Sequence, residues 1–181
     1  MTTYVAFIRA INVAGHASVK MNELKRVFVA AGCGDVRTFV QSGNVLFEVP
    51  EPDAEAVFEK VRIELRKLLK AEPTVLFRKL REICRMVEQN PFKELDHDSD
   101  AKLYVTFLSR KPGAKPNFPI RSPKEGLEAI GVEDLEVFIV SRRKENGYFG
   151  FPNNFIEKEL GVLATSRNRS TVKKVARMAE G

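Results

Sequence analysis

The chain has 181 residues, of which 44% are apolar and 30% are charged. This composition is typical of a globular protein that buries roughly 70% of its unfolded surface, and it excludes a disordered or fibrous chain. No segment approaches the roughly 20 apolar residues that cross a bilayer, and residues 1–4 lack the basic-then-apolar order of a signal peptide. We therefore expect a cytoplasmic protein with no membrane partner.

Lysine and arginine outnumber aspartate and glutamate by 30 to 24, which gives a formal charge of +6. A basic balance favours anionic partners, but only modestly here, because acids are interleaved along segments such as residues 61–67. Basic residues concentrate only at Arg142-Arg143-Lys144 and over residues 167–177. We interpret these as an exposed hairpin tip and a solvated helix face.

The first half of the chain is predicted to fold in the order β-α-β-β-α-β. Gly32 is expected to end the first helix, the Gln41-Ser42-Gly43-Asn44 segment is a hairpin turn, and Asp53 is a plausible N-cap. This order is that of the ferredoxin-like, split βαβ arrangement, so an α+β subdomain is expected over residues 1–79. The strands are predicted over residues 4–8, 36–40, 45–49 and 74–77, and the helices over residues 21–31 and 53–69.

The second half, residues 80–181, is predicted to form another α+β subdomain that packs against the first. A short helix should end before Asn90-Pro91, and Asn154 and Ser170 or Thr171 are expected to begin the last two helices. No sequence repeat between the halves is detected, and the topology of this half stays open. The other predicted features are a strand over 103–108, a proline-rich connection over 111–123, a hairpin of 135–140 with 148–151, a helix stop at Gly161 and a helix over 171–178.

Polar residues follow the first predicted strand and flank the hairpin turn, and strand directions place them at one edge of the sheet. The first helix begins at the same edge, so its unpaired N–H groups add to a potential anion site. We therefore predict a cleft for a small phosphate-bearing ligand, to which Arg167 and Asn168 approach across the subdomain boundary. The residues expected in the first subdomain are Arg9, Asn12, Lys20, Gln41, Ser42 and Asn44.

A structural interpretation of the same residues stands beside the ligand hypothesis. The segment from Gln41 to Asn44 is above all a turn, in which Gly43 tolerates positive φ and the Asn44 side chain closes the loop. Asn12 is also suited to tying down the loop that follows it. Arg9 is harder to explain in this way, because it directly follows a strongly apolar strand.

The sequence offers no recognisable catalytic constellation. His16 and His97 have no companion at metal-ligand spacing, and Asp96-His97-Asp98 lies in a polar loop where solvation is the expected state. No nucleophile elbow or phosphate-binding glycine loop is present, so enzyme activity is uncertain and no cofactor or metal is assigned. Cys33 and Cys84 are expected to be reduced thiols.

Five short motifs stand out along the chain: Arg9 through Gly15, Lys20-Met21, Gln41 through Asn44, Asn90-Pro91-Phe92 and Thr165 through Val172. In combination they resemble the motifs of the bacterial family known as domain of unknown function 1697. Ala10 and Ala14 stand where the family pattern has glycine, and Arg169 stands where an aromatic residue is usual. The resemblance implies an α+β protein with ferredoxin-like parts, and it brings no established activity, cofactor or catalytic residue.

Two other classes of function compete with anion binding. RNA-recognition domains share the β-α-β-β-α-β order, but they stack bases on aromatic residues of their central strands, and residues 44–48 offer only Phe47. We rank nucleic-acid binding below small-anion binding. A purely structural or protein-interaction role is about as plausible as either, and the oligomeric state is not readable.

Overall fold

The structure is a computed structural model that describes residues 1–11, 18–39, 43–95 and 100–178. Its internal packing divides the chain into two compact units, Met1–Ile83 and Cys84–Gly181. Each unit contains helices and an antiparallel sheet, which confirms the predicted α+β fold class.

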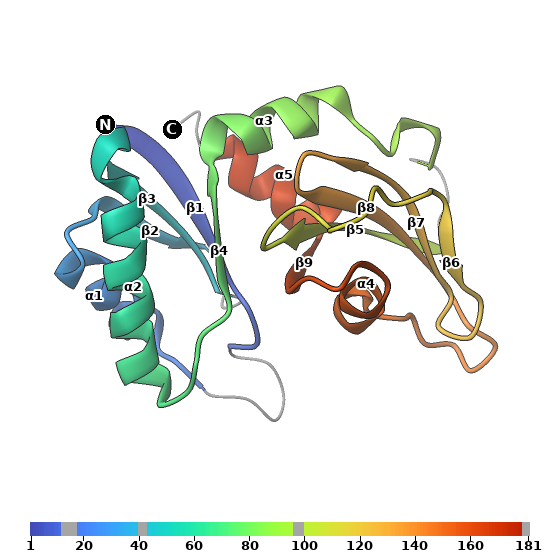
Figure 1. Cartoon of the computed structure of the whole chain (residues 1–181), viewed down its shortest axis with the longest axis horizontal. Helices are drawn as coiled ribbons and strands as arrows, with labels where there is room; N and C mark the ends of the chain where they lie inside the picture. Colours follow the sequence, from blue (N-terminus) through green and yellow to red (C-terminus); the bar gives the residue numbers. More distant parts are fainter. Residues whose placement is uncertain (12–17, 40–42, 96–99, 179–181) are drawn as a thin grey trace. The chain divides into compact units, whose positions relative to one another are not determined.

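The first unit is a four-stranded sheet in the order β2-β3-β1-β4, in which every neighbouring pair is antiparallel. β3 lies between β1 and β2 and is antiparallel to both, as the sequence predicts. Both long helices lie on one face of this sheet (Figure 1). The elements are β1 (Thr2–Ile8), α1 (Met21–Ala30), β2 (Gly34–Phe39), β3 (Asn44–Val49), α2 (Ala54–Leu69) and β4 (Val75–Lys79).

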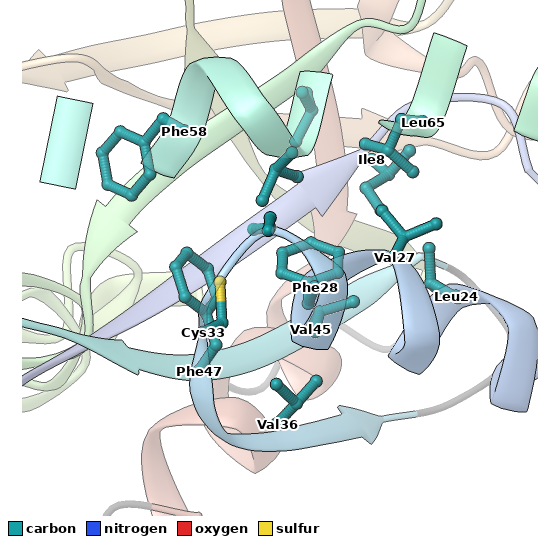
Figure 2. Close-up of a cluster of buried hydrophobic side chains, with 14 of the residues drawn as sticks. Ile8, Leu24, Val27, Phe28, Cys33, Val36, Val45, Phe47, Phe58 and Leu65 are labelled. Atoms are coloured by element: carbon teal, nitrogen blue, oxygen red, sulfur yellow. The ribbon is translucent and has the colours of Figure 1, made fainter. Parts of the chain in front are cut away.

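The core of the first unit forms where alternate strand residues meet the two helices. Phe47 of β3 is its centre, with Tyr4 at 5.9 Å and Phe28 at 5.1 Å between ring centroids (Figure 2). Val5 and Phe7 point to the opposite face and are also fully buried, so β1 is apolar on both sides. This is why the strand reads as an unbroken apolar run.

Cys33 belongs to this core and is a free thiol, as is Cys84. Burial raises the pKa of Cys33 to about 12, because the thiolate would lose its hydration there. The Cys33 side chain is therefore uncharged at neutral pH and behaves as a small apolar residue.

The start of α2 differs in detail from the prediction. Asp53 occupies the N-cap position, but it ends a 3₁₀ turn (Glu51–Asp53) and its backbone is already helical, with φ −94° and ψ −5°. Its side chain makes no capping hydrogen bond. The preceding 3₁₀ turn takes over the entry into the helix, because a turn of this kind supplies its own backbone bonds.

The second unit is a sheet in the order β6-β7-β8-β5-β9 with antiparallel neighbours. α4 packs on one face through Phe155 and Ile156, and α5 covers the other, where Val172 meets Val105 (Figure 1). The elements are α3 (Leu80–Gln89, which crosses the division between units), β5 (Ala101–Leu108), β6 (Ile120–Ser122), β7 (Leu127–Glu133), β8 (Glu136–Arg142), α4 (Pro152–Leu160), β9 (Ala164–Asn168) and α5 (Arg169–Arg177).

Several sequence predictions for this half are wrong. The strand at 135–140 pairs with β7 and β5 rather than with residues 148–151, which contribute a single bridge between Arg143 and Phe149. Asp134, at φ 49°, makes the tight turn that joins β7 to β8. α4 begins at Pro152 instead of Asn154, because the fixed φ of proline suits the first helical turn. Gly161, at φ 65°, ends α4 as predicted.

The two units repeat one topology, although no sequence repeat was detected. β5, β7, β8 and β9 have the order and directions of β1, β2, β3 and β4. In both units a helix joins the last two of these strands, and a second helix directly follows the last strand. The difference lies between the first two strands, where the first unit has α1 and the second has β6.

Backbone hydrogen bonds at the end of the first strand are also equivalent in the two units. Ile8 N–H donates to Gly43 O at 2.8 Å, and Leu108 N–H donates to Leu135 O at 2.8 Å. Arg9 N–H donates to Thr74 O at 2.9 Å, and Ser109 N–H donates to Leu163 O at 2.8 Å. Each first strand is thus fastened to the segments that precede both of its neighbours.

We predict that Gly43→Ala destabilises the protein by about 2 kcal/mol or more. Gly43 has φ 73°, and an added Cβ would lie 2.7 Å from Ile8 O and 2.8 Å from Ile11 Cγ1. Gly113→Ala is the matched control, since a Cβ there meets nothing within 4 Å. Urea denaturation of both variants measures the difference, and equal stabilities would show that the packing at Gly43 is not tight.

Candidate functional site

The segment that follows β1 forms one wall of an open hollow in the first unit. Arg9 is half-buried and held by its backbone bond to Thr74, while Ile11 is buried and packs next to Gly43. Ala10 adopts the left-handed conformation at φ 57°, which turns the chain out of the strand direction. The hollow has a volume of about 300 Å³ and is lined by Arg9, Ala10, Ile11, Leu69, Ala71, Glu72, Pro73 and Thr74.

The left-handed backbone at Ala10 gives a physical reason for the glycine in the family pattern at this position. A residue with a Cβ pays roughly 1–2 kcal/mol to adopt this conformation, whereas glycine does not. In this protein Ala10 adopts the left-handed conformation in spite of that cost. Alanine therefore strains the turn rather than abolishing it.

The charges around the hollow are set by two arginines and one glutamate. Glu72 accepts hydrogen bonds from Arg66 Nε at 2.6 Å and from Arg66 Nη2 at 2.8 Å. These bonds lower the pKa of the Glu72 carboxyl, so it stays ionised at neutral pH. Its negative charge is matched by Arg66, and Arg9 adds a positive charge to the lining.

Of the residues predicted at the hairpin turn, Gly43 and Asn44 are described, whereas Gln41 and Ser42 lie outside the described residues, as does Asn12 after β1. Asn44 is fully buried, and its Nδ2 donates to Phe39 O at 3.4 Å. This amide closes the connection between β2 and β3. Gly43 lies close to both ends of the Ile8–Ile11 segment, since an added Cβ at Gly43 would lie 2.7 Å from Ile8 O and 2.8 Å from Ile11 Cγ1.

Lys20 occupies the N-cap position of α1 and is exposed. Its backbone N–H donates to the Glu23 carboxylate at 3.2 Å. A carboxylate in the first turn offsets the positive end of the helix dipole. The contribution of the α1 N-terminus to anion binding is reduced accordingly.

Arg167 lies on β9 in the second unit and is 9% exposed. Its Nη1 donates to Thr165 Oγ1 and to Ser166 O, each at 2.9 Å. Burial lowers the pKa of Arg167 to about 10, which still leaves the guanidinium charged at neutral pH. On the opposite face of β9, the hydroxyls of Ser166 and Thr106 are hydrogen-bonded at 2.7 Å.

Asn168 is the N-cap of α5. Its Oδ1 accepts from Ser170 N at 2.9 Å and from Ser170 Oγ at 2.8 Å. The prediction of Ser170 or Thr171 as the cap is wrong, because β9 runs directly into α5 without an intervening loop. Asn168 therefore has a complete structural role within its own unit.

Sequence reasoning missed a contact between two of the motifs in the second unit. Arg169 Nη2 donates to Asn90 Oδ1 at 2.8 Å, and the guanidinium lies 5.8 Å from the centre of the Phe92 ring. Phe92 is buried and meets Phe138 edge-on at 5.6 Å. Arg169 thus stacks on an aromatic ring although it stands where the family has an aromatic residue. The adjoining cavity of about 20 Å³ holds at most a single water molecule.

The structure places the predicted site residues in two groups. In the first unit, Arg9 directly follows β1, Asn44 pairs with Phe7 near the end of β1, and Lys20 precedes α1. Arg167 and Asn168 belong to the β9–α5 junction of the second unit. The approach of the second group to the first stays a prediction. His16 and the Asp96-His97-Asp98 segment lie outside the described residues.

Within residues 1–11, 18–39, 43–95 and 100–178, no group of three His, Cys, Asp or Glu side chains is suited to a metal ion. No helix in the same part of the chain has the length and apolar character needed to span a membrane.

The sequence profile of the family described as "Protein of unknown function (DUF1697)" matches residues 1–138. The chain belongs to this family. Among solved structures, the fold is similar to that of the conserved bacterial protein SP0830 from Streptococcus pneumoniae. The TM-score is 0.64 at 18% identity, and the match covers 98% of each chain. At this identity the likeness concerns the fold alone. No curated protein matches the chain.

We predict that Asn168→Ala lowers the free energy of unfolding by about 1 kcal/mol, because the α5 N-terminus loses its cap. Asn168→Asp keeps a capping oxygen and should stay within a few tenths of a kcal/mol of the parent. Thermal melting of the two variants distinguishes them. If both variants matched the parent, the bonds from Ser170 to Asn168 would not stabilise the fold.

Proposed function

We propose that the hollow at the end of β1 binds a small anionic ligand that carries a phosphate group, with Arg9 as the charged hydrogen-bond donor. The observation that carries this proposal is the position of Arg9 on the wall of an open cavity of about 300 Å³. That volume is at the lower end of the range for ligand sites, so it suits a small molecule. A guanidinium is well matched to phosphate because it offers parallel donors in one plane.

The walls of the hollow are held by backbone contacts, which supports binding without a large rearrangement. Arg9 and Thr74 are joined by their 2.9 Å bond, and Gly43 packs against Ile11 on the other side of the turn. A preformed wall lowers the entropy cost of ordering a site when a ligand arrives. Glu72, the acidic residue of the lining, forms an exposed ion pair with Arg66, so its negative charge is compensated.

The equivalent position of the second unit provides an internal comparison. Ser109 holds the position equivalent to Arg9. The next residue, Arg110, donates through Nη2 to Gly161 O, at the end of α4, at 3.2 Å. Arg110 therefore serves the C-terminus of a helix, where a cation is favourable. The shared topology alone does not produce the arrangement around Arg9.

The structural alternative has specific support at two of the predicted residues. Asn44 bonds within the β2–β3 connection, and Asn168 caps α5. We assign these two side chains to the fold and keep Arg9 as the centre of the ligand proposal. The ferredoxin-like character of residues 1–79, the separate subdomain over 80–181, the cytoplasmic location and the bacterial origin implied by the resemblance are also carried as proposals.

Arg9→Gln is expected to weaken phosphate binding about tenfold or more, since it removes charge-assisted hydrogen bonds. Inorganic phosphate is the probe, titrated at constant ionic strength while the melting temperature is followed, with sulfate as a second anion. Arg110→Gln is the matched control, because it removes the same charge after the equivalent strand.

The proposal requires a saturable response to phosphate in the parent that Arg110→Gln retains and Arg9→Gln loses. Two results would contradict it. One is the absence of a saturable response in the parent, and the other is an equal loss in both variants. A large fall in the melting temperature of Arg9→Gln without ligand would identify Arg9 as a structural tie.

A further inference from the structure

A second surface, in the other unit, combines exposed aromatic rings with cations. We name it the tip surface and define it by Lys102, Arg143, Tyr148, Phe149 and Phe151. These residues come from the start of β5, the end of β8 and the segment leading into α4. None of them takes part in the ligand proposal above.

Contacts within the tip surface hold cations beside aromatic rings. Lys102 Nζ lies 4.5 Å and Arg143 Cζ lies 4.8 Å from the centre of the Phe149 ring. The Phe151 ring meets Tyr104 edge-on at 5.6 Å. Residues 148–151 are thus fastened to the end of the sheet, and two cations are fixed next to the exposed segment.

Two rings of the tip surface are turned toward solvent to an unusual degree. Tyr148 is 72% exposed and Phe151 is 55% exposed. Leaving large rings in water forgoes the free energy that burial would provide, and exposed rings beside cations are the composition of surfaces that bind nucleic acids. The neighbouring Arg142 and Lys144 add to the positive charge.

Acidic groups are also present, and they set the balance of charge. Asp100 Oδ1 lies 3.7 Å from Arg143 Nε. The Asp100 side chain is 81% exposed and the Arg143 side chain is 52% exposed. Such an exposed pair is weak, because water and salt screen it. A phosphate group can therefore replace Asp100 as the partner of Arg143. Glu145 and Glu125, whose backbone lies next to Gly150, also oppose the basic run. Among the described residues, three acids including Asp100 thus stand beside the four basic residues Lys102, Arg142, Arg143 and Lys144.

We infer that the tip surface binds single-stranded nucleic acid, with backbone phosphates beside Lys102 and Arg143 and with bases stacked on Tyr148 and Phe151. A single strand fits this composition because its bases are free to stack on exposed rings, whereas bases in a duplex are already stacked. The site is distinct from the central-strand aromatics of RNA-recognition domains, because Tyr4, Phe7 and Phe47 on the central strands of the first sheet are buried. Recognition of this kind is tolerant of sequence.

Fluorescence anisotropy with a labelled oligothymidine of about 12 nucleotides tests the inference on the full chain at roughly 50 mM salt. Tyr148→Ala should weaken binding about tenfold, whereas Tyr148→Phe keeps the ring and the affinity. The logarithm of the binding constant falls linearly with the logarithm of the salt concentration, and Lys102→Gln should reduce the magnitude of this slope by about 0.7, the contribution of one phosphate contact on a single strand. Arg62→Gln is the control, because Arg62 lies 5.2 Å from the Phe77 ring in the first unit and carries the same charge.

Four outcomes would overturn the inference. They are no binding at about 100 µM protein, equal affinities of Tyr148→Ala and Arg62→Gln, equal affinity for a duplex of the same length, and displacement of the oligonucleotide by polyglutamate at equal charge. The last result would show that the tip surface recognises negative charge on any partner, including an acidic protein. Because Tyr148 is largely exposed, its substitution should leave folding unaffected. The melting temperature of the Tyr148→Ala variant checks this.

Discussion

The end of β1 is the point on which the first unit depends. Two backbone hydrogen bonds, from Ile8 to Gly43 and from Arg9 to Thr74, fasten the central strand to the segments that precede its two neighbours. They require a residue without a Cβ at Gly43, because the space there is taken by Ile8 O and Ile11. With three segments joined at one place, Arg9 belongs to a wall held by backbone hydrogen bonds, and a hollow forms beside it.

The corresponding junction in the second unit has the same strand topology, but its side chains make different contacts. Ser109 and Leu163 repeat the backbone bond of Arg9 and Thr74. Arg110 then turns to the end of α4 and satisfies a helix carbonyl at Gly161. One junction serves packing and the other borders a cavity, so the side chains rather than the strand order determine what each can do. Functions on a repeated scaffold diverge in this way because sites are added to folds.

The first half of the fold was readable from the sequence because its signals are local. Unbroken apolar runs mark β1 and β3, helical spacing marks α1 and α2, and Gly43 marks the turn between β2 and β3. The second half was harder to predict for a physical reason. β9 is polar at Thr165, Ser166 and Arg167, yet these side chains are buried and hydrogen-bonded to each other or across to β5. A strand of this composition resembles a loop until its partners are known.

The candidate site divides in the same manner. Arg9 could be singled out because an arginine directly after a buried strand needs a physical explanation. The opposite wall, residues 69–74, could not be predicted, since it depends on the left-handed turn at Lys70 that follows the end of α2. The capping role of Asn168 could not be predicted, because it requires that β9 and α5 follow each other without a loop.

The most direct measurement is a titration of the isotope-labelled parent protein with inorganic phosphate, followed by amide chemical shifts at constant ionic strength. The account predicts saturable shifts at Ala10, Ile11 and Thr74, which line the hollow. It predicts no such shifts at Arg110 and Leu163, their counterparts in the second unit. Shifts that are absent from the first group, or that are equal in both groups, would contradict the claim that the end of β1 is a ligand site.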